Sequence, residues 1–355
     1  MAKITISDVA MHAGVSKKTV SFVINGLEGI SNATRQKVEA SISALGYVPN
    51  PQGRALATGR AAMIAIIHDG SDPAMLASTL DGVATAIDDR PIAMAVKGLA
   101  GRSATDTDSL STFLENQRPQ AVLLLPPLSS DNELAGLCIA ASSTCVRIAP
   151  TRKGYPAGLV CSNDRQAVLD AVGYLRALGH RRIAFIAGPD GHPAAAEREA
   201  GFSEAMDMQA GGLDTGVLAQ GDFTFLSGLE VGRLLLELSP RPTAILAANA
   251  DMAAGVLMAA QEQALVVPAA LSVMAIGDIT HGDQFSPPLT TMALPFEEMA
   301  RLATLKALRP TEAGTLPVDV FAELVKRGSA GAAPSTHQAD EGDPSARASA
   351  RVQTG

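Results

Sequence analysis

The sequence contains no tryptophan, and aromatic residues make up only 3% of its 355 positions. A hydrophobic core must therefore be built from Ala, Leu, Val, Ile and Met. Cysteine is also scarce, with three residues at positions 138, 145 and 161. Because their spacing is unpaired, it indicates neither a zinc cluster nor a disulfide framework. We expect reduced thiols in a cytoplasmic protein.

Long apolar runs are missing as well. The longest, Ala121 to Leu128, contains two prolines and is too short to cross a bilayer. The N-terminus lacks the apolar segment of a secretory signal. We therefore expect no membrane segment and no export.

The sequence also lacks the common motifs of catalysis. It has no G-x-x-x-x-G-K-[ST], no G-x-S-x-G, no H-E-x-x-H and no G-x-G-x-x-G. Its six histidines and scattered acidic residues are ordinary for this length. We expect neither an enzyme nor a bound metal or cofactor.

Charge is distributed unevenly along the chain, whose net charge is −8. Residues 1–60 hold seven Lys and Arg against three Asp and Glu, a net charge of +4, and the remainder holds 21 against 33, a net charge of −12. Such asymmetry suggests a nucleic-acid contact at the N-terminal end and an acidic body behind it.

The segment from Ile6 to Asn25 has the pattern of a helix-turn-helix. Its apolar residues are those that two small crossed helices would bury, namely Val9, Ala10, Ala13, Val15, Val20 and Val23. Gly14 stands where the turn needs positive φ, and Ser16 is a natural N-cap for the second helix. Lys17 and Lys18 then lie exposed in its first turn, where a polyanion such as DNA would stabilise them.

A third helix is expected over Asn32 to Leu45, capped by Ser31 and ended by Gly46. Pro49 and Pro51 interrupt the chain after it. The following segment, 52–58, is too short to be a stable helix by itself and is expected to fold on a partner.

From Ala61 onward, short apolar runs alternate with helical patterns, which predicts parallel sheets covered by helices on both faces. The expected strands are Met63–Ile67, Ile92–Val96, Ala121–Leu125, Cys145–Ile148, Ile183–Ala187, Ala244–Ala247 and Val273–Ile276. The expected helices are Pro73–Asp88, Ser109–Asn116, Asp164–Leu178, Ala195–Met208, Phe225–Leu238 and Asp251–Gln263. This length exceeds one core, so we expect two lobes and a ligand crevice beyond the carboxyl ends of their strands.

The predicted organisation has four parts. Residues 1–48 form a small all-α helix-turn-helix domain, and 49–60 form a hinge. Residues 61–328 form an α/β core of two lobes, one of about 61–160 with 292–318 and the other of 161–291 with 319–328. Residues 329–355, rich in Ala, Ser, Gly, Pro and charge, are predicted to be disordered.

An ordered set of motifs resembles the LacI family of bacterial transcription regulators. "ITISDVAMHAGVSKKTVSFVING", "SNATRQKVEASISALGYVPN" and "GRALATGR" resemble that family's DNA-binding head and hinge. "ALGHRRIAFIAGP", "EREAGF", "QGDFTF", "NADMAAGVL" and "SPPLTT" resemble its periplasmic-binding-protein-like effector core. The resemblance implies a homodimer that binds a pseudo-palindromic double-stranded DNA operator and responds to a small molecule, often a sugar or related metabolite. It predicts a regulator located in the cytoplasm, at the nucleoid.

The second helix of a helix-turn-helix reads base edges in the major groove. Four residues there are the expected readers: Lys17, Lys18, Ser21 and Phe22. The family more often has Arg at the position of Phe22, so an apolar contact to a thymine methyl replaces a guanine contact here; the alternative is that Phe22 packs inside the head. The expected phosphate contacts are Thr5, Ser16, Thr19, Asn25, Ser31 and Thr34, several of which are equally candidates for helix caps.

Leu56 is the most informative residue of the hinge. It lies between Ala55 and Ala57, near the basic Arg54, and has little to bury it in a free chain. An apolar wedge can enter the minor groove and kink a duplex. The resemblance implies that paired hinge helices insert this leucine into the operator; the alternative is a linker residue that packs on the core.

The resemblance also predicts an effector site. Arg198 matches the family's ligand arginine, although an ordinary surface arginine beside Glu197 and Glu199 is the alternative. The other expected members are Asp164, Asn249, Phe223 and Asp278, joined by His68 and Asp69 at the end of the first core strand, where capping or a turn is the alternative role. Gly277 replaces a carboxylate that often binds sugar hydroxyls, which favours a larger or more anionic ligand. A solute-binding protein of the same two-lobed shape is the rival interpretation of the core.

Overall fold

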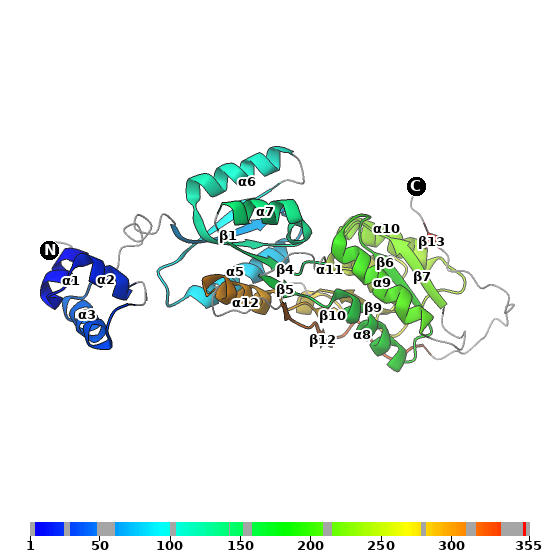
Figure 1. Ribbon diagram of the computed structural model, residues 1–355. Coiled ribbons are helices and arrows are strands. Elements are labelled where there is room, and N and C mark those ends of the chain that lie inside the picture. The colour runs from blue at the N-terminus through cyan, green and yellow to red at the C-terminus, as the bar shows by residue number, and fades with distance from the viewer. Residues whose placement is uncertain are drawn as a thin grey trace.

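The computed structural model describes residues 4–24, 29–47, 61–99, 104–141, 143–151, 158–208, 215–277, 282–309, 317–334 and 351–352. The described elements fall into three groups: an N-terminal helical head, a first α/β lobe and a second α/β lobe (Figure 1). The expected fold class, a helix-turn-helix head followed by a two-lobed core with parallel sheets, is confirmed.

The head consists of α1 (Ile6–Ala13), α2 (Lys17–Ile24) and α3 (Asn32–Leu45). They enclose a small core in which Val9, Val20 and Val38 are fully buried. Gly14 adopts φ 63°, the left-handed conformation that the turn between α1 and α2 requires. The Ser16 hydroxyl accepts a hydrogen bond from the Thr19 amide at 3.1 Å, which confirms it as the cap of α2.

The first lobe contains a six-stranded sheet in the order β11-β5-β4-β3-β1-β2. The strands are β1 (Ala61–His68), β2 (Ala93–Gly98), β3 (Pro119–Leu124), β4 (Thr144–Ile148), β5 (Leu159–Cys161) and β11 (Val318–Asp319). Helices α5 (Pro73–Ile87) and α12 (Phe296–Leu308) pack on one face, and α6 (Ala104–Gln117) and α7 (Asn132–Ala140) on the other, with a short 3-10 turn at Leu128–Ser130. Figure 1 shows α12 beside α5, although more than 200 residues separate them.

The second lobe contains a seven-stranded sheet in the order β12-β10-β9-β8-β6-β7-β13. Its strands are β6 (Arg182–Ala187), β7 (Thr215–Gln220), β8 (Ala244–Ala247), β9 (Ser272–Ile276), β10 (Thr290–Ala293), β12 (Glu323–Val325) and β13 (Arg351–Val352). The helices are α8 (Asp164–Ala177), α9 (Pro193–Asp207), α10 (Phe225–Leu236) and α11 (Ala250–Glu262), with a 3-10 turn at Gly282–Gln284. Every strand pair that the structure describes is parallel except β10 with β12.

The chain passes between the lobes three times: after β5, after β10 and after β11. Two of these crossings are joined by a hydrogen bond of 2.8 Å from the Ala322 amide to Asn163 Oδ1. The second crossing comes slightly later than the expected 292, because β10 continues to Ala293 beside β9 of the second sheet. In open parallel sheets, ligands bind beyond the carboxyl ends of the strands, which directs attention to the residues that follow β1 and β6.

The prediction of a disordered tail from residue 329 is wrong for residues 329–334. Ser329 is fully buried, and its hydroxyl donates to the Val273 carbonyl at 2.6 Å. The buried ring of His180 holds the next turn, with Nε2 3.0 Å from the Gly331 carbonyl oxygen. Arg351–Val352 likewise pair with β7. The composition of this segment predicted disorder. The hydrogen bonds that order it come from Val273 and His180, which are far away in the sequence and which composition does not reveal.

Candidate functional site

The head presents one face of α2 to solvent. Val20 and Val23 point into the small core, whereas Lys17 and Lys18 are exposed in the first turn. Ser21 and Phe22 are half-buried one turn later. These four residues share the face of α2 that is turned away from its own core, as the sequence predicted.

Phe22 does not belong to the apolar cluster of the head among the residues that the structure describes. The ring is instead covered by its neighbour one turn back, with Lys18 Nζ 5.6 Å from the ring centroid. An ammonium at that distance interacts favourably with the negative face of an aromatic ring. The alternative, in which Phe22 packs inside the head, is therefore not what the structure shows.

The hydroxyls expected at phosphates form helix caps in the free head. Thr5 donates from its amide and its hydroxyl to Asp8 Oδ2, at 2.8 and 2.7 Å, and these bonds hold the pKa of Asp8 below its ordinary value. Ser31 accepts from the Thr34 amide at 3.3 Å at the start of α3, as Ser16 does from Thr19 at the start of α2. Three predicted DNA contacts, Asn25, Arg54 and Leu56, lie outside the described residues.

In the second lobe, Arg198 and Asp164 form a buried ion pair. Arg198 Nε and Nη2 each lie 2.7 Å from Asp164 Oδ1, and the two side chains are only 11% and 6% exposed. Arg198 Nη1 donates to the Ala248 carbonyl at 2.6 Å, and the Ser162 hydroxyl donates to Asp164. Arg198 is therefore not the surface arginine that its neighbours Glu197 and Glu199 suggested as an alternative.

An aromatic side chain lies beside this pair. The guanidinium carbon of Arg198 is 6.0 Å from the centroid of the Phe223 ring. Phe223 adopts φ 72°, which is uncommon for a residue with a side chain. Its carbonyl accepts a hydrogen bond of 2.7 Å from Asn249 Nδ2, which holds this conformation. A Cβ added at Gly188 would collide with the ring, so the glycine makes room for it.

Asn249 forms two hydrogen bonds within the second lobe. Its Oδ1 accepts from the Met252 amide at 3.0 Å and so caps α11, while its Nδ2 holds the Phe223 carbonyl. Both polar ends of this side chain are thus bonded within the protein. Asn249 thus positions Phe223, and its contact with an effector stays a prediction, because each end of the amide can form a further hydrogen bond.

The first lobe contributes His68 and Asp69 at the end of β1. His68 Nδ1 is buried and has no hydrogen-bond partner among the residues that the structure describes. Asp69 Oδ1 accepts from the amide and the hydroxyl of Ser71, at 2.9 and 2.6 Å, so it does form the turn that was its alternative role. The Asp69 carboxylate nevertheless acts electrostatically on His192 of the second lobe. Asp69 of the first lobe is thus within electrostatic range of the second-lobe residues around Phe223.

His192 is a member of the site that the sequence analysis missed. Its ring stands edge-on to Phe223, with the centroids 5.0 Å apart, and its Nδ1 accepts from the Ala195 amide at 3.4 Å as the cap of α9. Burial and the positive charge of Arg198 lower its pKa, against the opposing effect of Asp69 and Asp164. The His-Pro pair at the start of α9 was the available signal, because proline favours the first helical position.

Two further carboxylates, Asp251 of the second lobe and Asp72 of the first, influence each other electrostatically. The pKa of Asp251, in the first turn of α11, is raised by partial burial and by the negative charge of Asp72, the cap of α5 in the first lobe. The described residues of the candidate site thus include several carboxylates, and the buried Arg198 is already paired. Asp278, the remaining predicted member, lies outside the described residues.

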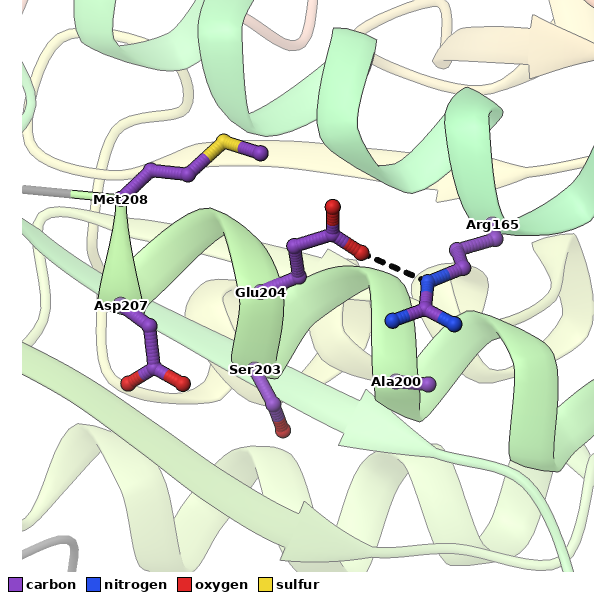
Figure 2. A pocket seen from close by; sticks show the side chains of 6 residues that line it. All are labelled: Arg165, Ala200, Ser203, Glu204, Asp207 and Met208. Carbon is purple, nitrogen blue, oxygen red and sulfur yellow. Dashed lines mark hydrogen bonds and ion pairs between the residues drawn. The ribbon is translucent and has the colours of Figure 1, made fainter.

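A separate depression of about 480 Å³ lies on the outer surface of the second lobe (Figure 2). Arg165 of α8 and Glu204 of α9 form an ion pair of 2.7 Å at its edge. The other lining residues are Ala200, Ser203, Asp207 and Met208. None of the predicted effector residues lines it, and its ion pair is solvent-exposed, in contrast to that of Arg198.

Within the residues that the structure describes, no cluster of His, Cys, Asp and Glu is suited to hold a metal ion. No helix in the same residues has the length and apolar character needed to cross a membrane.

Comparison with known proteins agrees with both parts of this architecture. Residues 5–50 match the family model "Bacterial regulatory proteins, lacI family", and residues 172–330 match "Periplasmic binding protein-like domain". The HTH-type transcriptional regulator CelR of Thermobifida fusca is 32% identical over 332 residues, which cover 90% of this chain and 95% of CelR.

Two solved structures share the fold. A CelR–cellobiose complex has a TM-score of 0.64 at 30% identity, covering 92% of this chain and 100% of that one. The lac repressor dimer bound to operator and the anti-inducer ONPF has a TM-score of 0.70 at 26% identity, covering 93% and 100%. The head, the two-lobed core and the nearly full-length similarity to CelR lead to one conclusion: this chain is a DNA-binding transcription regulator of the LacI family.

Proposed function

We propose that the head binds an operator while the cleft binds a small hydroxyl-rich effector, and that occupation of the cleft changes operator affinity. The observation that carries this proposal is the Arg198–Asp164 pair beside Phe223, at a cleft formed by two lobes on the same chain as a basic helix-turn-helix. Repression is the expected regulatory effect.

At the operator, α2 enters the major groove, where Lys17, Lys18, Ser21 and Phe22 face base edges. The caps of the head lie beside helix N-termini, whose free amides attract phosphate. The expected phosphate contacts are Thr5, Ser16, Thr19, Asn25, Ser31 and Thr34. From the hinge, Arg54 is a further expected DNA contact and Leu56 is the expected apolar wedge in the minor groove. Capping and phosphate binding are compatible, because the hydroxyls that form these caps retain further hydrogen-bonding capacity.

In the cleft, the paired charges of Arg198 and Asp164 suit a neutral polyol. A sugar hydroxyl both donates and accepts hydrogen bonds, so it matches a guanidinium next to a carboxylate. Phe223 offers an apolar face, and His68 and Asp69 come from the end of β1 in the first lobe. Asp278 stays an expected member of the site from the sequence. The solved CelR complex contains cellobiose, which supports a sugar or a related metabolite.

An anionic effector, which Gly277 suggested, is not favoured by the described residues. Arg198 is neutralised by Asp164, and Asp69, Asp72 and Asp251 add negative charge around the opening. A ligand with a phosphate or carboxylate would have to overcome this repulsion.

Coupling requires two copies of the chain. The lac repressor in the similar structure is a dimer on its operator, and a two-fold dimer matches a pseudo-palindromic site. We propose that residues 1–48 read DNA, 49–60 form the hinge and 61–328 form the sensing core. Effector-driven closure of the lobes then alters the spacing of the two hinges.

We further propose that the protein has no catalytic activity and acts in the cytoplasm at the nucleoid, because its head is built to bind chromosomal DNA. The decisive experiment is a gel shift of genomic fragments with the full-length protein, followed by a metabolite screen by thermal shift. Operator binding that changes with a stabilising sugar supports the proposal. A folded protein that binds sugars and ignores every duplex would instead be a solute-binding protein.

A further inference from the structure

Lys18 and Phe22 are one helical turn apart on the exposed face of α2 and are in contact with each other. The contact is specific to this pair in the described head: the ring lies outside the apolar core, and the ammonium nearest to it is that of Lys18. The contact with the ring restricts the rotation of the Lys18 side chain, so its ammonium would be presented to DNA from a position beside Phe22.

The chemistry of each group selects one feature of the major groove. A lysine donates to guanine O6 and N7, and an apolar side chain contacts the C5-methyl of thymine. The ammonium is 5.6 Å from the ring centroid, whereas successive base pairs are about 3.4 Å apart. This separation lies between one and two base-pair steps, so the two contacts fall on base pairs one or two steps apart, because a single base pair cannot supply both a guanine and a thymine.

We propose that Lys18 and Phe22 act as one composite reader that selects, in each operator half-site, a guanine one or two base pairs from a thymine methyl. The inference rests on the proposed operator binding and adds the pair of bases that this chain prefers. Phe22 has two roles in it: it contacts the methyl group, and it positions the Lys18 ammonium over the guanine.

The test begins with an operator selected from random duplexes by the full-length protein. Each thymine is then replaced singly by deoxyuridine, which removes the methyl and keeps base pairing. We expect one thymine per half-site whose replacement weakens binding about fourfold, the effect of one buried methyl-sized group. Replacement of the guanine one or two base pairs away by 7-deazaguanine, which removes N7, is expected to weaken binding about tenfold.

Three variants separate the two roles of Phe22. Phe22→Ala should bind the thymine and deoxyuridine operators equally. Phe22→Leu should keep the methyl preference but lose most of the 7-deazaguanine penalty, because the ring that positions Lys18 is gone. Lys17→Ala, the matched control, should weaken binding to all these duplexes and leave both ratios unchanged. Since Phe22 lies outside the apolar core, circular dichroism should show folded heads in every case.

The inference is overturned if no thymine is sensitive to deoxyuridine, or if Phe22→Ala retains the preference for thymine. It is also overturned if Phe22→Leu keeps the full 7-deazaguanine penalty, because Lys18 would then read guanine without the ring. Failure to select any duplex at all is a different result, which would reject operator binding itself.

Discussion

Arg198 and Asp164 lie 2.7 Å apart in a nearly dry part of the second lobe, and the guanidinium is fixed further by the Ala248 carbonyl. Asp164 begins α8, whereas Arg198 lies in the second turn of α9. The pair thus joins two helix N-terminal regions. It is a structural ion pair, and under the proposed function it is also the group that binds effector hydroxyls.

Replacement of Arg198 by alanine should abolish the thermal shift given by an effector and lower stability. Removing one partner leaves the buried Asp164 carboxylate unpaired, which costs about 3–5 kcal/mol in comparable pairs. Urea unfolding and a ligand thermal shift measure the two effects. Arg165→Ala is the matched control, because it breaks an exposed Arg–Glu pair in the same lobe and should cost no more than about 1 kcal/mol. A full effector shift in Arg198→Ala would remove this residue from the site.

Replacement of Gly188 by alanine should weaken effector binding while operator binding by the unliganded protein persists. The new methyl collides with the Phe223 ring and with Ala195, and overpacking of this kind costs about 1–3 kcal/mol. Displacement of the ring removes the apolar face of the cleft. Calorimetric titration with the effector and a gel shift measure the two activities. Unchanged effector affinity would show that the ligand does not touch Phe223.

Stability should fall on acidification, and His180 should account for part of the change. Burial lowers the pKa of His180 below its ordinary value of 6.5. The unfolded chain therefore binds the proton first, so the free energy of unfolding decreases as the pH falls below about 6.5 and stops decreasing below the folded pKa. His180→Gln should reduce this slope in urea titrations between pH 8 and pH 5. The slope should not vanish, because the pKa of His192 is lowered too. Parallel curves for the two proteins would contradict the prediction.

Replacement of Leu56 by alanine should lower operator affinity and leave effector affinity unchanged. The expected reason is the loss of an apolar wedge between base steps of the minor groove. Gel shifts and calorimetry on the same preparation test both halves of this statement. An unaltered operator affinity would reject the proposed role of the hinge leucine.

Local patterns predicted most of the helices and the inner strands. The helix over Asn32–Leu45 has the expected bounds, because Ser31 and Gly46 mark its ends within the segment itself. The strand over Leu159–Cys161 was not expected, since three residues are too few to show a pattern. Helices α7 and α12 were also missed; α12 is fixed by the α5 side chains on which it packs.

The residues of the candidate site likewise divide into those that the sequence predicted and those that it missed. Arg198, Asp164 and Phe223 were named from motifs, and the structure brings them together. His192 was missed, and so were the two hydrogen bonds by which Asn249 caps α11 and holds Phe223. The roles of His192 and Asn249 depend on hydrogen-bonding groups of other segments, which only the folded chain brings next to them.

The sequence by itself determined the positively charged helix-turn-helix head, the alternation of strands and helices, and the family. Capping, periodicity and motif order are properties of short segments, so they can be recognised without the fold. Only the tertiary structure decided that Arg198 is paired with Asp164, that Lys18 lies on Phe22, and that residues 329–334 are bound to the second lobe. The physical reason is that hydrogen bonds and burial depend on groups that the folded chain brings together from distant positions.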